Sequence, residues 1–120
     1  MASEAKTYEG SCHCGAVRYQ VDLALGPVVS CNCSICTRAG TLLVFVPADA
    51  FQVLSGSDAL GDYQFGQKVI HHHFCQICGI RPFSRGKDRE GRDVVAVNVR
   101  CLDGVDLDAL QIVRFDGRSL

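Results

Sequence analysis

Seven of the eight cysteines in this 120-residue chain fall into three tight clusters, and these clusters limit what the chain can fold into. The clusters are "CHC" at 12–14, "CNCSIC" at 31–36 and "CQIC" at 75–78. A tetrahedral metal ion takes four ligands, and a short cysteine spacing supplies two sulfurs from one tight turn. Seven sulfurs therefore complete one site and leave a second site one ligand short.

The N-terminal stretch "MASEAKTYEG" (1–10) is polar and lacks the apolar centre of a secretion signal. No apolar run reaches the roughly 18 residues of a membrane span. We therefore expect a cytoplasmic protein, in which disulfides are rare and metal thiolates are common. The alternative is an exported framework of four disulfides, but Cys-x-Cys pairs suit a shared metal ion better than bridges to separate partners.

The composition is that of a globular protein, with 48% hydrophobic and 21% charged residues. A net charge of −1 gives no electrostatic argument for binding nucleic acid or an anionic membrane. The length predicts one domain over residues 1–120, with residues 1–8 as a disordered tail. The sequence does not indicate the oligomeric state.

Most of the chain is predicted to be β-structure. In "AVRYQVDL" (16–23) apolar residues alternate with polar ones, and "RDVVAVNV" (92–99) alternates in the same way. The predicted buried faces consist of Val17, Tyr19, Val21 and Leu23 in the first stretch and Val95, Val97 and Val99 in the second. "TLLVFV" (41–46) is a continuous apolar run, typical of a strand covered on both sides. Shorter strands are expected at 51–55, 62–66 and 110–115.

Helical signals are weak. The stretches 47–51 and 57–60 each contain residues that can cap a single helical turn. The charged tract "RPFSRGKDREGRD" (81–93) is interpreted as a solvated hairpin loop. A sharper hypothesis is that Arg81 or Arg85 holds an anionic ligand near a metal ion, and Arg38 is a weaker candidate for the same role.

The pairs "CHC" and "CQIC" are each followed by glycine, which lets the backbone leave a metal-binding turn. Together they supply one four-cysteine cluster, Cys12, Cys14, Cys75 and Cys78. This site would tie the first strand to the middle of the chain, across the 61 positions between Cys14 and Cys75. Metal-coupled folding of this kind contributes on the order of 10–16 kcal/mol in zinc peptides.

The remaining three-cysteine cluster, Cys31, Cys33 and Cys36, can converge on one ion. Three protein ligands with an open fourth position are typical of a reactive zinc site. Three thiolates leave the zinc ion a weak Lewis acid, whereas a soft and exchangeable position suits an incoming thiol, which zinc keeps as thiolate. Thiol chemistry is therefore a better hypothesis than hydrolysis.

A fourth protein ligand would close the second site and make it inert. The candidates are Cys101 and the histidines, and Cys101 is equally well interpreted as a buried free thiol. In the run "HHH", His71 and His73 should point opposite to His72 on an extended chain. His13 and Asn32 occupy the middle of Cys-x-Cys pairs, where the side chain usually points away from the shared ion.

The motifs "GSCHCGAVRY" (10–19), "CNCSIC" and "FCQICG" (74–79), in this order, resemble the glutathione-dependent formaldehyde-activating (GFA) family. The resemblance covers nearly the whole chain. It implies the β-tent architecture: a mainly β, zinc-stapled fold of short antiparallel sheets with little helix. It also implies two zinc ions per chain, a structural one on the four-cysteine cluster and a catalytic one on the three-cysteine cluster.

The family's activity combines glutathione with formaldehyde to give S-hydroxymethylglutathione, a reaction classed with the carbon–sulfur lyases. The leading hypothesis is therefore a zinc-dependent carbon–sulfur lyase-type enzyme whose partner is a small thiol such as glutathione. Two alternatives are a non-catalytic, zinc-stabilised binding module and a thiol or redox sensor whose exposed cysteines oxidise and release zinc.

Overall fold

A computed structural model describes residues 5–119 as a mainly β fold, as the sequence predicts. One α-helix and five single 3₁₀ turns accompany ten strands. The strands are β1 (Lys6–Ser11), β2 (Arg18–Leu23), β3 (Val28–Cys31), β4 (Leu43–Pro47), β5 (Phe51–Ser55), β6 (Leu60–Tyr63), β7 (His71–Cys75), β8 (Phe83–Lys87), β9 (Asp93–Asn98) and β10 (Ile112–Phe115). The helices are α1 (Ser34–Ala39), η1 (Ala48–Ala50), η2 (Ser57–Ala59), η3 (Val99–Cys101), η4 (Leu107–Ala109) and η5 (Gly117–Ser119).

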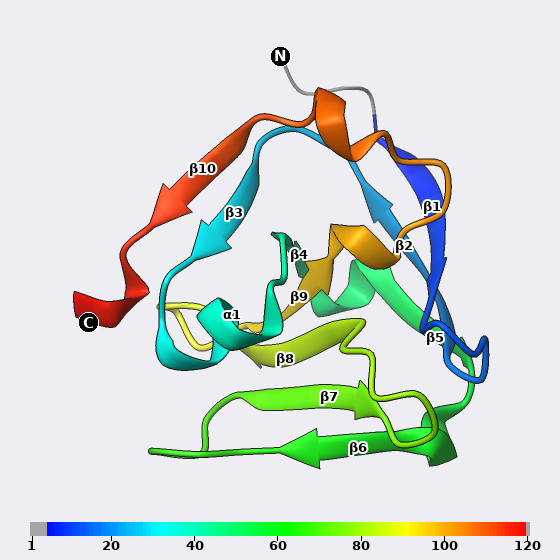
Figure 1. The fold of residues 1–120 in the computed structure, drawn as a ribbon, viewed down its shortest axis with the longest axis horizontal. Helices are drawn as coiled ribbons and strands as arrows, with labels where there is room; N and C mark the ends of the chain where they lie inside the picture. Colours follow the sequence, from blue (N-terminus) through cyan, green and yellow to red (C-terminus); the bar gives the residue numbers. More distant parts are fainter. Residues whose placement is uncertain (1–4, 120) are drawn as a thin grey trace.

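The strands form two sheets, one of three strands in the order β1-β2-β5 and one of seven in the order β10-β3-β4-β9-β8-β7-β6 (Figure 1). All neighbouring pairs are antiparallel except β10 and β3, which run parallel. The prediction of antiparallel sheets is therefore confirmed for every pair except this one. The connection from β9 to β10 crosses the molecule through η3 and η4, so β10 enters the sheet from the same end as β3.

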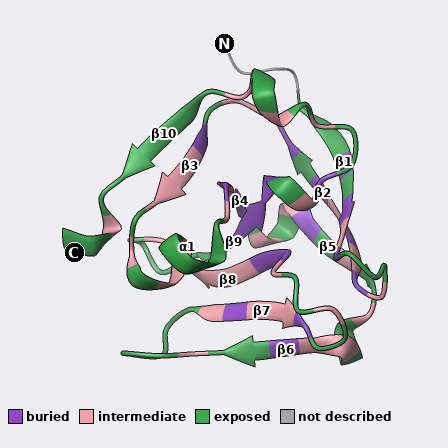
Figure 2. Cartoon of the chain, in the orientation of Figure 1, coloured by how far each residue is buried: buried purple, intermediate pink, exposed green. Residues whose placement is uncertain are grey.

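The core lies between the two sheets and includes the predicted faces of β2 and β9. Val17, Tyr19, Val21, Val95, Val97 and Val99 are all 0% exposed, and Leu23 is 8% exposed. Three aromatic rings join the sheets, because Tyr19 of β2 and Phe51 of β5 both contact Phe83 of β8, with ring centroids 5.7 and 4.6 Å apart. Figure 2 shows this buried material concentrated along β2 and β9, whereas β10 is exposed.

Strand β4 is not covered on both sides, contrary to the prediction for 41–46. Val46 is buried at 6% exposure, but Phe45 on the other face is 57% exposed. The apolar run therefore has a different explanation: one face of β4 packs on the core, and the other, with Leu43 and Phe45, lines a cavity.

The charged tract 81–93 is not one solvated loop, contrary to the prediction. Residues Phe83–Lys87 form strand β8 between β9 and β7, and only residues 88–92 form the turn. Arg85 lies in this strand, and its guanidinium packs over two core rings, 5.5 Å from the centroid of Phe51 and 5.3 Å from that of Phe83. The Arg85 side chain thus contacts aromatic rings, whereas its charge had suggested a position in a solvated loop.

The predicted helical turns are confirmed as η1 and η2, but other boundaries differ. Strand β6 ends at Tyr63, so the strand predicted at 62–66 begins and ends earlier. Strand β1 begins at Lys6, inside the tail predicted over 1–8, because Lys6 and Thr7 pair with Leu23 and Asp22 of β2. Positions 1–4 of that predicted tail lie outside the described residues.

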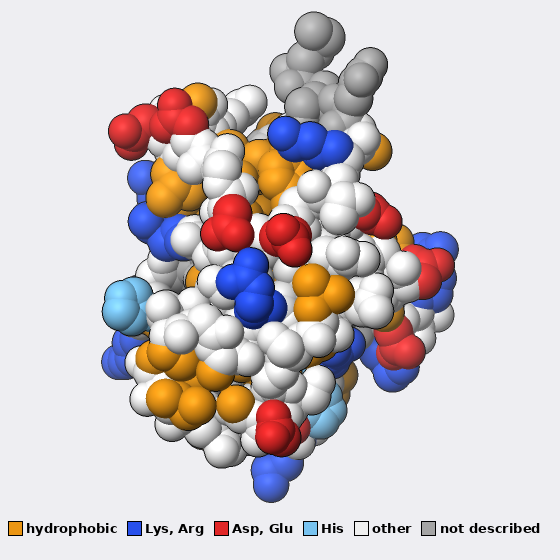
Figure 3. All heavy atoms as spheres, turned by 90° about the vertical axis from the view of Figure 1, so that its right-hand side faces the viewer, with side chains coloured by type: hydrophobic (Ala, Val, Ile, Leu, Met, Phe, Trp, Pro, Cys, Tyr) orange, Lys and Arg blue, Asp and Glu red, His pale blue; other side chains and the backbone are white. Residues whose placement is uncertain are grey.

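Surface charges of both signs are mixed on the face seen in Figure 3, where lysine and arginine side chains lie beside carboxylates. Elsewhere in the structure, ion pairs join Arg18 to Asp103 at 3.9 Å and Lys87 to Asp93 at 2.5 Å. Within residues 5–119, no helix is both long and apolar enough to cross a lipid bilayer.

Candidate metal centres

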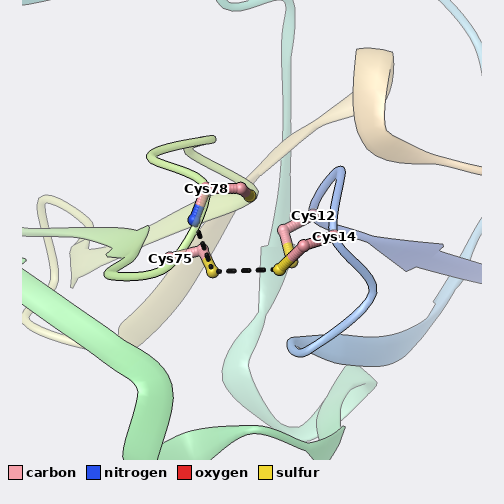
Figure 4. Close-up of side chains that lie close together, drawn as sticks. All are labelled: Cys12, Cys14, Cys75 and Cys78. Carbon is pink, nitrogen blue, oxygen red and sulfur yellow. Dashed lines mark hydrogen bonds between the residues drawn. The ribbon is translucent and has the colours of Figure 1, made fainter.

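The four-cysteine cluster brings together two turns that are far apart in the sequence and that follow strands of different sheets. Cys12 and Cys14 follow β1, whereas Cys75 ends β7 and Cys78 lies in the turn after it (Figure 4). The four sulfurs lie within 4.8 Å of one another. The Sγ atom of Cys14 is 3.6 Å from that of Cys12 and 3.7 Å from that of Cys75. These separations match the edge of about 3.8 Å that a tetrahedron of thiolates has at zinc–sulfur distances of about 2.3 Å.

The backbone around each turn is shaped to aim the sulfurs inward. The Val17 amide donates to Cys12 Sγ at 3.3 Å, and the Cys78 amide donates to Cys75 Sγ at 3.5 Å. Gly15 and Gly79 follow the two pairs with φ of +82° and +83°, which other residues rarely adopt. The two glycines predicted to release the backbone from these turns therefore do so through a left-handed conformation.

The thiols of this cluster cannot all be charged without a cation. Hydrogen bonding from the backbone amide of Ile80 is the main cause that lowers the pKa of Cys78 to about 6. A hydrogen bond from the Ala16 amide lowers the pKa of Cys14, but desolvation and the three neighbouring sulfurs together outweigh it and raise the pKa to about 11. A divalent cation among the four sulfurs would offset this repulsion, so the donor set fits a bound metal ion.

No disulfide joins any of the eight cysteines, and seven of them instead converge in two groups. Cys75 is 0% and Cys12 3% exposed. The four-cysteine cluster therefore joins the end of the first strand of one sheet to the last residue of β7 in the other, with two of its members in the core and Cys14 exposed.

The three-cysteine cluster lies on one short segment at the end of β3. Cys31 is the last residue of β3, Cys33 precedes the first residue of α1 and Cys36 lies inside α1. The three sulfurs lie within 4.8 Å of one another, and all three residues are partly exposed. These cysteines could hold a metal ion between the strand and the helix.

Sequence reasoning missed α1, although two signals were present. Cys33 and Cys36 are three positions apart, which places both side chains on one face of a helical turn. Gly40 follows with φ of +71°, and its amide donates to the Cys36 carbonyl at 2.9 Å, as at a helix C-terminus. With only six residues, the helix is too short for its periodicity to be recognised.

Burial and mutual repulsion separate the thiols of the three-cysteine cluster. Burial, with the sulfurs of Cys33 and Cys31, raises the pKa of Cys36 to about 12. Burial acts in the same direction on Cys33, but amide bonds from Cys36 and Ile35 and the neighbouring thiols bring its pKa below the ordinary value. As in the four-cysteine cluster, a cation would relieve the competition.

None of the candidate closing ligands joins the three-cysteine cluster within the described part of the chain. Cys101 instead lies near the four-cysteine cluster, where it lines a pocket together with Cys12. Burial, followed by the charges of Cys12 and Cys78, raises its pKa to about 11. The His71 ring bonds to Asp62 at 2.7 Å. Among residues 5–119, the group around Cys31 contains no further histidine, cysteine or carboxylate within ligand distance.

The histidine run alternates as predicted for an extended chain. His71 and His73 stack on each other with centroids 6.1 Å apart, whereas His72 stacks on Phe65 at 5.5 Å. Burial, followed by the charge of Arg81, lowers the pKa of His72, so its ring is neutral at pH 7.

Asn32 holds a C-terminal segment against the three-cysteine cluster. Its side chain donates to Asp116 Oδ1 at 2.9 Å and accepts from the Arg118 amide at 2.9 Å. The approach is close, because a Cβ added at Gly117 would lie 2.6 Å from the sulfur of Cys31. The side chain of Asn32 thus serves the packing of this segment.

Of the three arginines considered from the sequence, Arg81 is the one placed at the three-cysteine cluster. It lines the same cavity as Cys33 and Cys36, and their charges act on its pKa, which burial lowers overall. Arg85 lies over core rings, and Arg38 donates to the Ser34 carbonyl at 2.9 Å on the surface of α1.

A cavity of about 490 Å³ opens beside the three-cysteine cluster, and we call it the apolar cavity. The three cysteines form part of its wall, together with residues of β3, β4, β8, β9 and β10. Sites for small molecules usually have volumes of roughly 300–1,000 Å³. The three sulfurs are therefore within reach of a small ligand.

A family model described as "Glutathione-dependent formaldehyde-activating enzyme" matches residues 7–112. The chain belongs to this family. The GFA-family protein is also similar to a solved structure, the crystal structure of a Rhodobacter sphaeroides protein, with 33% sequence identity and a TM-score of 0.76. That match covers 88% of this chain and 99% of the other. The family predicted from the three cysteine motifs is confirmed.

Proposed function

We propose that this GFA-family protein is a zinc-dependent enzyme of the carbon–sulfur lyase type, acting in the cytoplasm on the adduct of a small thiol and an aldehyde. The observation that supports this most is the position of three converging cysteine sulfurs in the wall of a cavity of ligand size. Glutathione and formaldehyde, which the family description names, are the first pair to test.

In this proposal the two clusters have different roles. Cys12, Cys14, Cys75 and Cys78 hold a structural zinc ion, and Cys31, Cys33 and Cys36 hold a second one. Thiolate donors at tetrahedral spacing favour zinc over the harder calcium and magnesium ions. At the three-cysteine cluster, zinc when bound supplies a position that keeps a substrate thiol deprotonated at neutral pH.

The chemistry needs one carbon–sulfur bond to form or break. In the forming direction, the substrate sulfur bonds to the aldehyde carbon, the π electron pair moves to the carbonyl oxygen, and this oxygen gains the proton that the thiol has lost. In the lyase direction the same bond breaks. The chain contributes apolar walls such as Leu43, which exclude water, and the cation of Arg81, which favours the anionic form of a nearby sulfur or oxygen.

The position of Arg81 is itself fixed by the fold. The side chain of Asn98 donates to the Arg81 carbonyl at 3.0 Å, and Asn98 is only 7% exposed. Its side-chain oxygen accepts from the Leu42 amide at 3.3 Å, which ties the residue to the start of β4. This bonding holds the backbone of Arg81 beside the cavity.

The proposal is tested by NMR exchange spectroscopy of glutathione and formaldehyde, since this measures the rate of adduct formation above the spontaneous rate. We expect Cys36→Ser to lower the catalysed rate by about 100-fold or more. Cys101→Ser is the matched control, because Cys101 belongs to neither cluster, and it should stay within about threefold of wild type. Equal rates in both variants would contradict the assignment.

The non-catalytic binding module remains a second candidate, favoured by the exposed apolar residues at the cavity rim. Phe45 is 57% exposed and Phe115 is 48% exposed. On this alternative, Cys36→Ser leaves any turnover unchanged. A redox sensor would instead lose one zinc ion under mild peroxide without unfolding, which metal analysis of the treated protein measures.

A further inference from the structure

The apolar cavity is lined mainly by hydrocarbon side chains. One end of its wall carries the three-cysteine cluster, and most of the remainder comes from β3, β4, β8, β9, β10 and the segment between β6 and β7. The apolar side chains on which the argument depends are Leu43, Phe45, Phe65, Ile70, Val94 and Phe115. A ligand whose sulfur reaches the cysteines would therefore place its carbon skeleton against these side chains.

Strands β4 and β9 have two apolar faces, although the core uses only one of them. Val95 and Val97 are fully buried in the core, whereas Val94 and Ala96, which alternate with them, line the cavity. Strand β4 repeats this arrangement, with Phe45 towards the cavity at 57% exposure. A strand face that meets only water is usually polar in an antiparallel sheet. The apolar second faces thus fit an apolar ligand.

The cavity offers little charge to a ligand. Its charged lining residues are Arg81 and Lys87, and the lining contains no aspartate or glutamate. The Lys87 amine already pairs with Asp93 at 2.5 Å. Arg81 is half-buried, and among residues 5–119 no carboxylate forms an ion pair with it. One guanidinium is therefore the charge available to a substrate.

We propose that the thiol used by this protein has an aromatic or branched aliphatic skeleton and one carboxylate, with the skeleton in the apolar cavity and the carboxylate on Arg81. This inference rests on the proposed function and narrows its substrate. A carboxylate is the complement of a guanidinium, with which it makes two parallel hydrogen bonds.

Glutathione fits this cavity poorly on the same grounds. It carries two carboxylates and an ammonium group, whereas the cavity has one free cation and no acidic residue for the ammonium. Burying an unpaired charge is costly, so glutathione would have to leave its charged ends in solvent and would gain little from the apolar walls. The apolar thiol is expected to bind more tightly.

The test is calorimetric titration of the zinc-loaded protein with three thiols. Two of them, 2-mercapto-3-phenylpropanoate and 2-mercaptopropanoate, share the same thiol and carboxylate and differ only in the phenyl ring. The third is glutathione. We expect the ring to tighten binding by roughly 30-fold, since burying an aromatic side chain has an effect of this size. Glutathione should bind no more tightly than 2-mercaptopropanoate.

Variants locate the effect in the cavity. Phe45→Ser and Ile70→Ser change residues that are 57% and 46% exposed, so both should fold, and each should reduce the contribution of the ring to about fivefold or less. Leu54→Ser is the matched control, because Leu54 is 44% exposed on β5 and outside the cavity lining, and it should leave binding unchanged. Arg81→Gln should weaken both mercaptocarboxylates about tenfold.

Each other outcome has a definite meaning. Equal binding of the two mercaptocarboxylates, or tighter binding of glutathione, overturns the inference and leaves the proposed function standing. Absence of binding by all three thiols overturns both. If the cavity variants alter only the association state of the protein, measured by sedimentation, the apolar surface is an interface between copies and the inference is wrong.

Discussion

The two cysteine clusters place the same side chain in opposite settings. The four-cysteine cluster draws its sulfurs from two turns far apart in the sequence, and two of its members are almost fully buried. The three-cysteine cluster takes its sulfurs from six consecutive positions and stays partly exposed beside the apolar cavity. The contrast teaches that two clusters of the same ligand type can differ in sequence separation and burial, and that these differences distinguish a cluster that joins distant elements from one that faces a cavity.

Removing one ligand from each cluster tests this contrast most strongly. Cys75→Ala should leave the protein unfolded at 25 °C, because metal-coupled folding on the order of 10 kcal/mol exceeds the stability of many small domains. Cys36→Ala should lower the free energy of unfolding by less than about 1 kcal/mol, since it closes no long loop. Near-UV circular dichroism and urea unfolding measure both. Equal losses would remove the distinction.

The buried amide of Asn98 lies between the two regions, so its removal should affect both. It accepts from the amides of Leu42 and Arg100 and donates to the Arg81 carbonyl and the sulfur of Cys101. Asn98→Ala leaves these groups without partners, and we expect a loss of about 2–4 kcal/mol in the free energy of unfolding. A urea midpoint close to that of wild type would show that water replaces the side chain.

Gly117→Ala should disturb the three-cysteine cluster alone. The added methyl group would lie 2.6 Å from the sulfur of Cys31, so the cluster must shift, and thiol affinity should fall about tenfold while stability changes by less than about 1 kcal/mol. Gly104→Ala is the control with the opposite expected result. Gly104 has φ of +74° and open space around it, so an alanine there strains the backbone without contacting a sulfur. Calorimetry with a thiol and thermal unfolding separate the two results.

The smallest expected effect concerns His72 in the cavity wall. Burial lowers its pKa in the folded protein below the value of about 6.5 in the unfolded chain. As the pH falls through 6.5, the unfolded chain therefore binds more protons than the folded protein does. The free energy of unfolding is unaffected by protonation of His72 above that pH and decreases below it. NMR titration of the imidazole measures the pKa directly. A pKa above 6.5 would mean that the His72 ring is exposed to solvent rather than buried in the cavity wall.

Sequence reasoning recovered the parts of the fold that depend on local periodicity or on ligand spacing. The alternation of Val17, Tyr19 and Val21 identified a strand with one buried face, and all three side chains are fully buried. The cysteine spacing brought Cys14 and Cys75 into one group. In both cases the signal lies in the residue types themselves.

What the sequence did not reveal depends on contacts between distant segments. The apolar run at 41–46 was interpreted as doubly covered, because a residue such as Phe45 reads the same whether it faces protein or a cavity. Arg85 was placed in a loop, since its packing over Phe51 and Phe83 is invisible before the sheets assemble. The parallel pairing of β10 with β3 follows from a crossover of the chain that no local pattern encodes.

This parallel pairing also sets an order in which the protein can mature on the ribosome. All seven clustered cysteines precede β10 in the sequence, so the four-cysteine cluster can assemble once Cys78 has left the exit tunnel. The wall that carries Phe115 and the close packing of Gly117 on Cys31 can form only after translation has continued by about another forty residues. A nascent chain would thus acquire its four-cysteine scaffold first and the complete wall of the apolar cavity later.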